Sequence, residues 1–405
     1  MHRWMVLFLA LLPASLAPAA EPADFSGTWS STYGPLTLRQ TGDRVVGQYQ
    51  LEETSGLVEG TVDGRKLTFT YRESNASGEG WFELATDGRS FDGRWREKGK
   101  TEWSRWTGTS GQAQARRFDG IWNSTYGPLQ LQQTENTAQG FYRMADGRFA
   151  SVSGTVAGTE FSFSYDECGV KGSGVFTLGA DGDSFSGTWK TAEGTPGTWT
   201  GIRLEPKPGR IWLVVLEARW EESLTEREYA YGSMLEAYFA RTPNVECRHR
   251  FFDDADSLLR ACSEIPFLPE PVVVVIASHG SEEGISSSGR TIGAATLAEC
   301  FARARNVKLL HFSACSVMAG TLPAEMAKAL PKGIAFPMSG YATAVDWGAS
   351  AATEFLYLDL VLARDMEPDE AARQLLKLLP IAGDRGTPDA PFDPLGFRFV
   401  KKPAP

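Results

Sequence analysis

The sequence of 405 residues predicts a multidomain protein in which two small all-β meander barrels or sandwiches precede a three-layer α/β domain. Three observations predict this: an internal repeat, a period-two alternation within it, and continuous apolar runs in the second half. The chain is also longer than one hydrophobic core usually serves. We predict a signal peptide over 1–20, β repeats over 21–110 and 115–203, and an α/β domain over 209–400.

The N-terminal segment has the pattern of a secretory signal peptide. His2 and Arg3 form a basic start, an apolar run covers 4–12, and the small residues Ala17 and Ala19 follow. The apolar run is shorter than the roughly 20 residues that a membrane-spanning helix needs. We therefore expect a secreted or periplasmic protein with no integral membrane span after signal removal.

The repeat is the clearest feature of the first half. The segment FSGTWSSTYGPLTLRQ from Phe25 returns as FDGIWNSTYGPLQLQQ from Phe118, and later segments of the two copies also match. Stretches such as 67–71 alternate between apolar and polar residues, and Asp-Gly or Thr-Gly pairs separate them. About eight short antiparallel strands remove their exposed edges by closing into a barrel or a flattened sandwich. The pattern resembles small lipocalin- or avidin-type barrels, and such folds fix no function.

After 203–210 the composition changes, through a Pro-containing linker, into alternating strand and helix patterns. Strands are expected at 211–216, 245–252, 272–277 and 307–312, with helices between them. The runs at 272–277 and 307–312 are continuously apolar, which is typical of parallel strands buried on both faces. The second half is therefore predicted to be a parallel sheet between two layers of helices.

Composition excludes several partners and cofactors. The formal net charge of −10 argues against nucleic acid or an anionic membrane surface, because both attract clusters of Lys and Arg. The Gly-rich stretch 280–289 lacks the Gly-Lys-Ser/Thr ending of a phosphate-binding loop. No paired cysteine spacing indicates a metal site. We therefore expect no nucleic-acid partner, no cofactor and no metal.

The five cysteines are an odd number, which matters if the protein is exported. Four of them can then form two disulfides in three alternative ways, and one thiol stays free. The sequence does not choose among these pairings. The cysteines are Cys168, Cys247, Cys262, Cys300 and Cys315, and Cys315 is the candidate for the free thiol.

His279 and Cys315 each follow one of the continuous apolar strands. Active groups of open α/β sheets gather at the carboxyl ends of the strands, and a right-handed crossover would put these two strands side by side. Acyl transfer at a thiol needs a nucleophilic sulfur, a proton donor for the leaving amine, and N–H groups that face the developing oxyanion. Cys315 would attack, His279 would protonate the leaving group, and the backbone amides of Gly280 and Cys315 would polarise the carbonyl.

The segments VVVVIASHG and VKLLHFSAC resemble the strand-Ser-His-Gly and strand-Ser-Ala-Cys motifs of caspase-like cysteine peptidases, which include caspases, legumain, gingipains, separase and CHAT domains. The resemblance covers most of 209–379 and is closest to CHAT domains. It implies a Cys315–His279 dyad and a protein or peptide substrate. The sequence departs from this pattern at 318–320, where CHAT sequences often have Thr-Gly-x-Gly after the cysteine.

Each of these residues also has a structural interpretation. Buried cysteines are common in cores, and a histidine at a strand end is often a satisfied polar group. The catalytic interpretation is favoured because His279 and Cys315 arrive together, in order, at two strand exits. His311 lies inside an apolar strand and is interpreted as structural.

Asp346 and Trp347 lie in a loop after a predicted strand at 334–341, where related peptidases often build the pocket for the residue before the scissile bond. A carboxylate there would favour Arg or Lys. Asp346 would equally serve as the N-terminal cap of a helix that starts near Gly348, and Trp347 would equally pack in the core. The sequence leaves both alternatives open.

The repeats contain matching aromatic pairs, Trp29 with Tyr33 and Trp122 with Tyr126. They could hold a sugar, a peptide or an apolar ligand, although aromatic residues of small barrels mostly form the core. The ligand of such a site is not readable from the sequence.

Two functions fit these observations. The first is an exported cysteine endopeptidase, with basic residues before the cleaved bond as its candidate specificity and with β repeats that target it, recruit substrate or inhibit it. In one variant, the enzyme is latent until the linker is cut near Lys207 or Arg210. The second is a catalytically inactive caspase-like scaffold whose β repeats bind a protein or a glycan.

Overall fold

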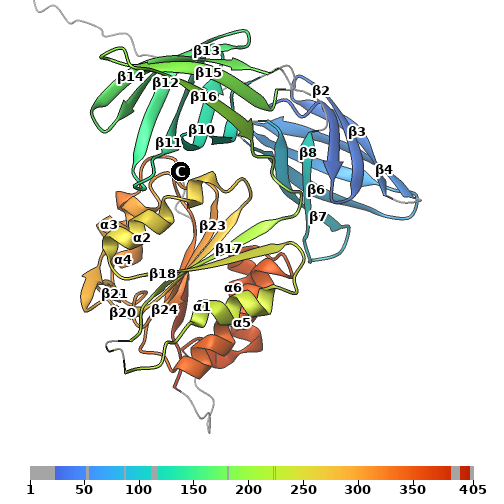
Figure 1. Cartoon of the computed structure of the whole chain (residues 1–405). Helices are drawn as coiled ribbons and strands as arrows, with labels where there is room; N and C mark the ends of the chain where they lie inside the picture. Colours follow the sequence, from blue (N-terminus) through green and yellow to red (C-terminus); the bar gives the residue numbers. More distant parts are fainter. Residues whose placement is uncertain are drawn as a thin grey trace, which may run out of the picture.

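The computed structural model describes residues 23–51, 54–85, 88–110, 117–179, 182–221, 223, 225–384 and 393–401. It contains two closed eight-stranded barrels followed by a six-stranded sheet flanked by helices (Figure 1). The predicted signal peptide over 1–20 lies outside the described residues. Within the described part, no helix combines the length and the apolar character needed to cross a bilayer.

The first barrel is an antiparallel meander in which every strand pairs with the next and β8 closes on β1. Alternation produces it: in β5, Leu67, Phe69 and Tyr71 point inward while the residues between them are exposed. Its strands are β1 (Gly27–Ser31), β2 (Gly34–Thr41), β3 (Arg44–Leu51), β4 (Thr54–Asp63), β5 (Lys66–Arg72), β6 (Ser77–Leu84), β7 (Ser90–Glu97) and β8 (Ser104–Ser110).

The second barrel repeats this architecture, and β16 closes on β9. Of the two predicted alternatives, barrel and sandwich, the barrel is therefore the correct one. Its strands are β9 (Gly120–Ser124), β10 (Gly127–Thr134), β11 (Thr137–Arg143), β12 (Phe149–Ala157), β13 (Glu160–Glu167), β14 (Val170–Leu178), β15 (Ser184–Thr191) and β16 (Pro196–Arg203).

Aromatic side chains fill the interior of both barrels. Trp106 meets Tyr49 and Phe82 edge to face, with ring centroids 4.8 Å and 5.2 Å apart. Trp199 has the corresponding position in the second barrel, 4.9 Å from Tyr142 and 5.2 Å from Phe176. Each barrel is thus a packed core built by the same aromatic set.

The second half forms a sheet in the order β18-β17-β19-β23-β24-β25, in which the strands run parallel except β25. The predicted parallel strands are confirmed, although the strand expected from residue 334 begins only at Met338, directly after Pro337, which has no N–H to donate to a neighbouring strand. The sheet strands are β17 (Ile211–Ala218), β18 (Val245–Phe252), β19 (Val272–Ala277), β23 (Val307–Ser313), β24 (Met338–Tyr341) and β25 (Phe397–Val400).

Helices cover both faces of this sheet (Figure 1). One hydrophobic core lies under α2 (Ala255–Cys262), α3 (Ala294–Cys300) and α4 (Leu322–Ala329). The other lies under α1 (Tyr231–Phe239), α5 (Trp347–Leu362) and α6 (Pro368–Leu378). The sheet accordingly has apolar side chains on both faces, as its uninterrupted Val and Ile runs predict. The remaining elements are η1 (Ile265–Phe267), η2 (Pro380–Ala382) and a hairpin sheet of β20 (His279–Ser281), β21 (Gly284–Ser287) and β22 (Arg290–Ile292).

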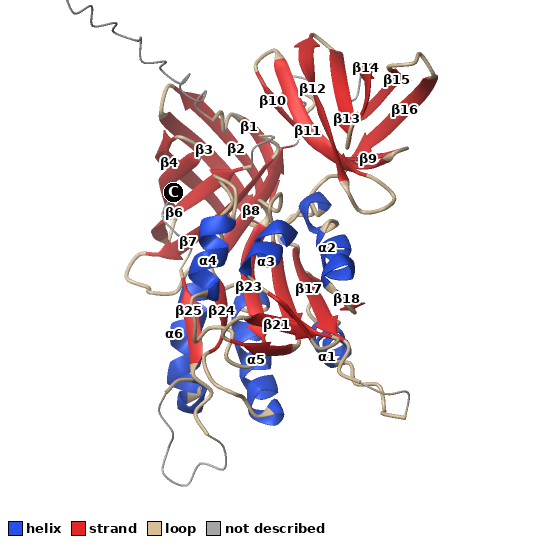
Figure 2. Cartoon of the chain, turned by 90° about the vertical axis from the view of Figure 1, so that its left-hand side faces the viewer, coloured by secondary structure: helices blue, strands red, loops and turns tan. Residues whose placement is uncertain are grey.

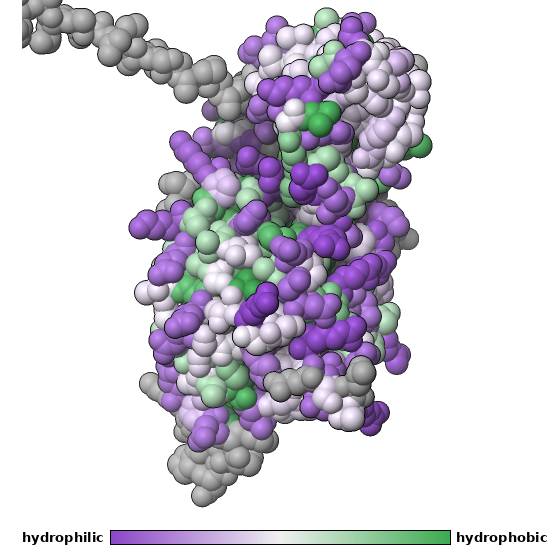
Figure 3. Space-filling view, turned by 60° about the vertical axis from the view of Figure 1, so that its left-hand side comes forward, coloured by the Kyte–Doolittle hydropathy of each residue, from purple (hydrophilic) through white to green (hydrophobic). Residues whose placement is uncertain are grey.

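Both barrels lie against the edge of the sheet where its parallel strands begin (Figures 1 and 2). In the first barrel, Arg94 contacts Glu367, between α5 and α6, at 2.5 Å. In the second, Arg143 donates to Ser263, just after α2, at 2.6 Å. On the face drawn in Figure 3, hydrophobic residues are scattered among hydrophilic ones across the sheet unit, by which we mean the six-stranded sheet and its helices, from β17 to β25. The edge where the parallel strands end points away from both barrels.

Candidate active site

His279 and Cys315 leave the sheet at the same level. Strands β19 and β23 are parallel neighbours, and their register pairs Ala277 with Ser313. His279 and Cys315 each follow two residues later. The Ser278 amide donates to the Ser313 carbonyl at 3.2 Å, which keeps the two chains together beyond the last paired residues. The predicted side-by-side arrangement of these two strands is confirmed.

Cys315 is half-buried in the turn after β23, and its Sγ accepts a hydrogen bond from the Val345 amide at 3.5 Å. The next residue, Ser316, has a φ of 58°, which is uncommon outside glycine. The Ser316 amide donates to the Thr343 carbonyl at 2.9 Å. The turn that carries the sulfur is therefore fixed to the loop that follows β24.

His279 is exposed and begins the hairpin strand β20, in which it pairs with Ser286 of β21. Its imidazole meets the indole of Trp220 edge to face, with ring centroids 5.0 Å apart and an interplanar angle of 79°. One side of the imidazole is therefore covered by an aromatic ring.

Gly280 lies directly against the Cys315 turn. A β-carbon at this position would be 2.6 Å from the Cys315 carbonyl oxygen and 2.7 Å from Cγ2 of Val317. Real side chains do not approach so closely, so only glycine fits without displacing one of the two loops. The hairpin that starts at His279 and the turn that holds Cys315 are thus in backbone contact.

Glu217, at the end of β17, is a site residue that the sequence reasoning missed. It is fully buried, and it accepts hydrogen bonds from Trp220 Nε1 at 2.6 Å and from the amides of Tyr231 and Gly232, both at 2.8 Å. Burial by itself would raise the pKa of Glu217, but these donors and His249 hold it below its usual value. The signal available in the sequence was a charged residue at the carboxyl end of an otherwise apolar strand.

Three aromatic residues, which we call the aromatic row, extend from His279 across the sheet edge: Trp220, Tyr229 and Trp347. Tyr229 lies 6.0 Å from Trp220 and 5.5 Å from Trp347, measured between ring centroids. Trp347 is 51% exposed, so the alternative that it packs in the core is wrong. Burial and the charges of Glu217 and Glu354 raise the pKa of Tyr229 to about 12, so its hydroxyl is neutral at ordinary pH.

Asp346 caps helix α5: its Oδ1 accepts a hydrogen bond from the Ala349 amide at 3.0 Å. The capping alternative is therefore observed. The carboxylate is nevertheless exposed and precedes Trp347, and Val345, its neighbour on the other side, contacts the Cys315 sulfur. The Asp346 side chain thus caps α5 and also faces solvent.

His311 is structural, as its position inside an apolar strand predicts. Its side chain is completely buried, Nδ1 lies 2.8 Å from Ser339 Oγ, and Nε2 lies 3.5 Å from the buried carboxylate of Glu354. Tyr231 donates a hydrogen bond to the same carboxylate at 2.6 Å. This polar cluster lies within the core under α1 and α5.

All five cysteines are free thiols, so none of the three pairings is formed. Burial raises the pKa of Cys247 to about 12, and burial together with a hydrogen bond to Cys300 raises that of Cys262 well above its usual value. These thiols are poor nucleophiles, because the thiolate is the reactive form. Only Cys168 is exposed, and it lies in the second barrel.

The predicted aromatic pairs of the repeats are not formed. Trp29 and Trp122 are core residues, and each donates its indole N–H to the backbone carbonyl four residues earlier in the chain, at 3.0 Å. Tyr33 follows the end of β1 and contacts Trp106 instead, at 5.2 Å. Tyr126 does the same with Trp199. The pairing fails because the tryptophans point into the barrels while the tyrosines lie in the turns.

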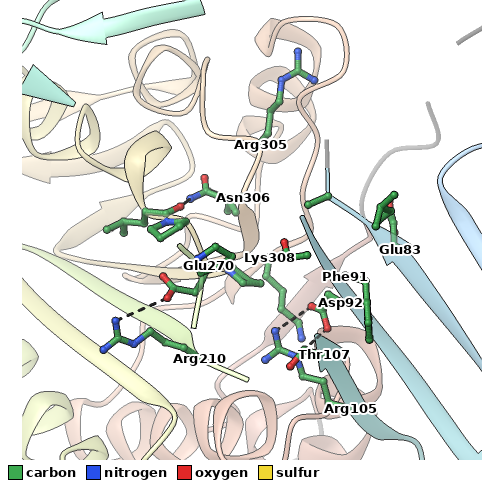
Figure 4. A pocket seen from close by; sticks show the side chains of 18 of the residues that line it. Glu83, Phe91, Asp92, Arg105, Thr107, Arg210, Glu270, Arg305, Asn306 and Lys308 are labelled. Atoms are coloured by element: carbon green, nitrogen blue, oxygen red, sulfur yellow. Dashed lines mark hydrogen bonds and ion pairs between the residues drawn. The ribbon is translucent and has the colours of Figure 1, made fainter. Parts of the chain in front are cut away.

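A cavity of about 770 Å³ lies at the opposite edge of the sheet, between the barrels and the start of the parallel strands (Figure 4). Arg105 contacts Asp92 there through two hydrogen bonds of 2.9 Å and 3.0 Å. Burial lowers the pKa of Lys308, whose Nζ lies 3.8 Å from Glu367. The sequence did not reveal this cavity, because segments far apart in the chain line it.

No protein-family model matches the chain, and a search of curated proteins gave no match. Within the described ranges, no three His, Cys, Asp or Glu side chains gather closely enough to ligate a metal ion. The site is therefore interpreted from its own residues.

Proposed function

We propose that this protein is a cysteine endopeptidase of the caspase-like superfamily, with Cys315 as nucleophile and His279 as general acid and base. The observation that carries the proposal is the register of β19 and β23, which brings a thiol and an exposed imidazole to the same level of adjacent strands. The contact between Gly280 and the Cys315 backbone supports it further, because the two loops form one unit.

In this mechanism His279 takes the proton of the Cys315 thiol, the resulting thiolate attacks the carbonyl carbon of the scissile peptide bond, and the carbonyl oxygen becomes an oxyanion. Backbone amides of Gly280 and Cys315 donate to this oxyanion, and one such donor is typically worth about 3–4 kcal/mol in the transition state. His279 then protonates the leaving amine. The thioester is hydrolysed by a water molecule that gives a proton to His279, and this step releases the acid product and restores the thiol.

We propose further that the enzyme cleaves after Arg or Lys. The exposed Asp346 carboxylate adjoins the loop that contacts the Cys315 sulfur, and the exposed Trp347 indole follows it. A guanidinium or ammonium group would gain from both the carboxylate and the aromatic face. The aromatic row would accommodate the methylene chain of such a side chain.

The sequence of the first 20 residues supports export as the setting for this activity. The barrels lie at the far edge of the sheet, so a role in recruiting substrate or targeting the enzyme fits better than direct blockage of the site. Lys207 is exposed, and Arg210 is held by Glu246 at 2.9 Å. A cut in this linker would break the covalent link between the barrels and the sheet unit.

The second candidate is an inactive caspase-like scaffold whose barrels bind a protein or a glycan. The observation that favours it is Tyr126, which is 42% exposed although it contacts the buried Trp199. An exposed aromatic face of this kind would stack on a sugar ring or an apolar side chain.

The deciding experiment is hydrolysis of a peptide–fluorophore library by reduced protein, with Arg, Lys, Asp, Asn and apolar residues before the cleaved bond. Cys315→Ala and His279→Ala should both abolish cleavage, whereas Cys168→Ala, which removes the exposed thiol of the second barrel, should leave it unchanged. Cleavage that survives Cys315→Ala, or no cleavage by folded wild type, would reject the peptidase and favour the binding function.

A further inference from the structure

The indole of Trp220 is held in place by a hydrogen bond to a buried carboxylate. Its Nε1 donates to Glu217 at 2.6 Å, which is a short, charge-assisted hydrogen bond. Glu217 is itself fixed by the first two amides of α1 and by His249, whose Nε2 lies 2.8 Å from it. The anchor therefore belongs to the framework of β17, β18 and α1, and it is independent of the loops that carry the dyad.

The same indole also meets His279. The two rings are 5.0 Å apart at 79°, and the His279 imidazole is otherwise exposed at the start of a hairpin. An exposed histidine samples several staggered conformations, and only one of them directs a ring nitrogen at a given partner. Contact with a fixed indole removes part of this freedom.

We propose that Trp220, anchored by Glu217, is a positioning residue that holds the His279 imidazole in the orientation needed to exchange protons with Cys315. The proposal rests on the proposed function and extends it to Glu217, at the end of a third strand, β17, and to Trp220, which follows that strand. The geometry supplies a chain of contacts from a buried carboxylate to the imidazole: Glu217 holds Trp220, and Trp220 meets His279. Displacement of a catalytic group by about 1 Å can cost roughly 100-fold in rate, so this support matters for turnover.

A matched control exists in β17, the strand that precedes Trp220. Trp212, near the beginning of β17, donates its indole N–H to Glu270, which is 2% exposed, at 2.7 Å. Trp220→Phe and Trp212→Phe both remove an indole–glutamate hydrogen bond and keep an aromatic ring. They differ in distance from the dyad, because Trp212 lies at the barrel edge of the sheet. A merely structural role for Trp220 predicts equal effects of the two substitutions.

The experiment measures two quantities on wild type, both tryptophan variants and His279→Ala. The first is kcat and KM on the best peptide substrate. The second is the rate at which iodoacetamide alkylates Cys315, which is monitored by the mass of the peptide that contains Cys315. This reaction requires no substrate turnover. Trp220→Phe should lower kcat by about 10- to 100-fold with little change in KM, and it should slow alkylation toward the His279→Ala rate. Trp212→Phe should match wild type in both.

The outcomes separate this proposal from the proposed function. If His279→Ala alkylates as fast as wild type, the thiol is not assisted by the imidazole, and both proposals fail. If His279→Ala is slow while Trp220→Phe equals Trp212→Phe, the dyad stands and the positioning role of Trp220 is overturned. The histidines number four in the whole sequence, so side-chain NMR of His279 can report the same reorientation directly.

Discussion

A β-carbon placed on Gly280 would lie 2.6 Å from the carbonyl oxygen of Cys315. The residue after the proposed catalytic histidine is thus in contact with the backbone of the proposed nucleophile. The two loops cannot separate without losing this contact. The relative position of His279 and Cys315 therefore depends on residue 280 being a glycine, which has no β-carbon.

We expect Gly280→Ala to destabilise the protein by roughly 1–3 kcal/mol, the usual range for overpacking a tight site, and to abolish most cleavage activity. The reason is displacement of the Cys315 turn. Thermal unfolding and peptide hydrolysis measure the two effects. Gly293→Ala is the control, because the nearest atom to its added β-carbon is the Glu283 carbonyl oxygen at 3.5 Å. A fully active and stable Gly280→Ala protein would contradict the contact.

The sequence was sufficient for the two β barrels, for the parallel strands of the second half, and for the position of His279 and Cys315 at the ends of two neighbouring strands. Period-two alternation within a repeated segment predicts barrel strands, and continuous Val runs predict parallel strands, because both patterns report directly on which faces are buried. His279 and Cys315 were found because strand ends are visible in the sequence as changes in composition. The parallel register of β19 and β23 then brings them to the same level.

The supporting residues were not predictable in this way. Glu217 and Trp220 contact α1 and the β20 hairpin, which follow them at a distance in the chain. Likewise, Trp29 and Tyr33 were grouped because they are close in sequence, yet a strand residue and a turn residue face different surroundings. Side-chain direction at the end of a strand depends on the turn, and the sequence pattern does not encode it.

Arg94 is expected to hold the first barrel to the sheet unit. Its side chain is 3% exposed and contacts Glu367 at 2.5 Å and Asp365 at 2.9 Å. The matching residue of the second repeat is Thr188, so this contact is specific to one copy. Arg94→Thr should cost roughly 1–3 kcal/mol, below the roughly 3–5 kcal/mol for breaking a fully buried pair, because Glu367 is 42% exposed.

Thermal unfolding measures this loss, and small-angle X-ray scattering should show a larger, less compact particle. Arg96→Thr is the control: Arg96 lies on the same strand and the same side, but it contacts Glu79, which is 52% exposed, within the barrel. Its loss should cost under about 1 kcal/mol. Equal effects of the two substitutions would show that Arg94 does not fasten the barrel.

Glu217 should make stability sensitive to acid. Burial raises its pKa, but hydrogen bonds from His249, Gly232, Trp220 and Tyr231 outweigh burial, and the net pKa is below the usual value. A carboxyl with a depressed folded-state pKa contributes stability above its unfolded pKa of about 4.3, and this contribution is lost as pH falls through the folded-state pKa. Glu217→Gln should therefore destabilise the protein most at neutral pH, and the difference from wild type should shrink below about pH 4.

Denaturant titrations across this pH range test the prediction. Glu59→Gln provides a comparison, because its carboxylate pairs with Arg44 on the barrel surface and is 62% exposed. The free energy of unfolding of Glu59→Gln should differ little from that of wild type at every pH. A Glu217→Gln difference that is constant from neutral to acidic pH would mean that ionisation of Glu217 does not contribute to stability.

Asp346 performs one observed task and one proposed task, and asparagine separates them. Asparagine caps helices about as well as aspartate, so Asp346→Asn should leave the thermal midpoint nearly unchanged, whereas Asp346→Ala should lose about 1 kcal/mol with the cap to Ala349. If the carboxylate also binds a basic side chain, Asp346→Asn should reduce kcat/KM for Arg and Lys substrates by about tenfold, which corresponds to about 1.4 kcal/mol. Hydrolysis after apolar residues should change little. A stable Asp346→Asn protein that keeps its full preference for basic substrates would restrict Asp346 to the helix cap, and specificity would then have to come from the aromatic row.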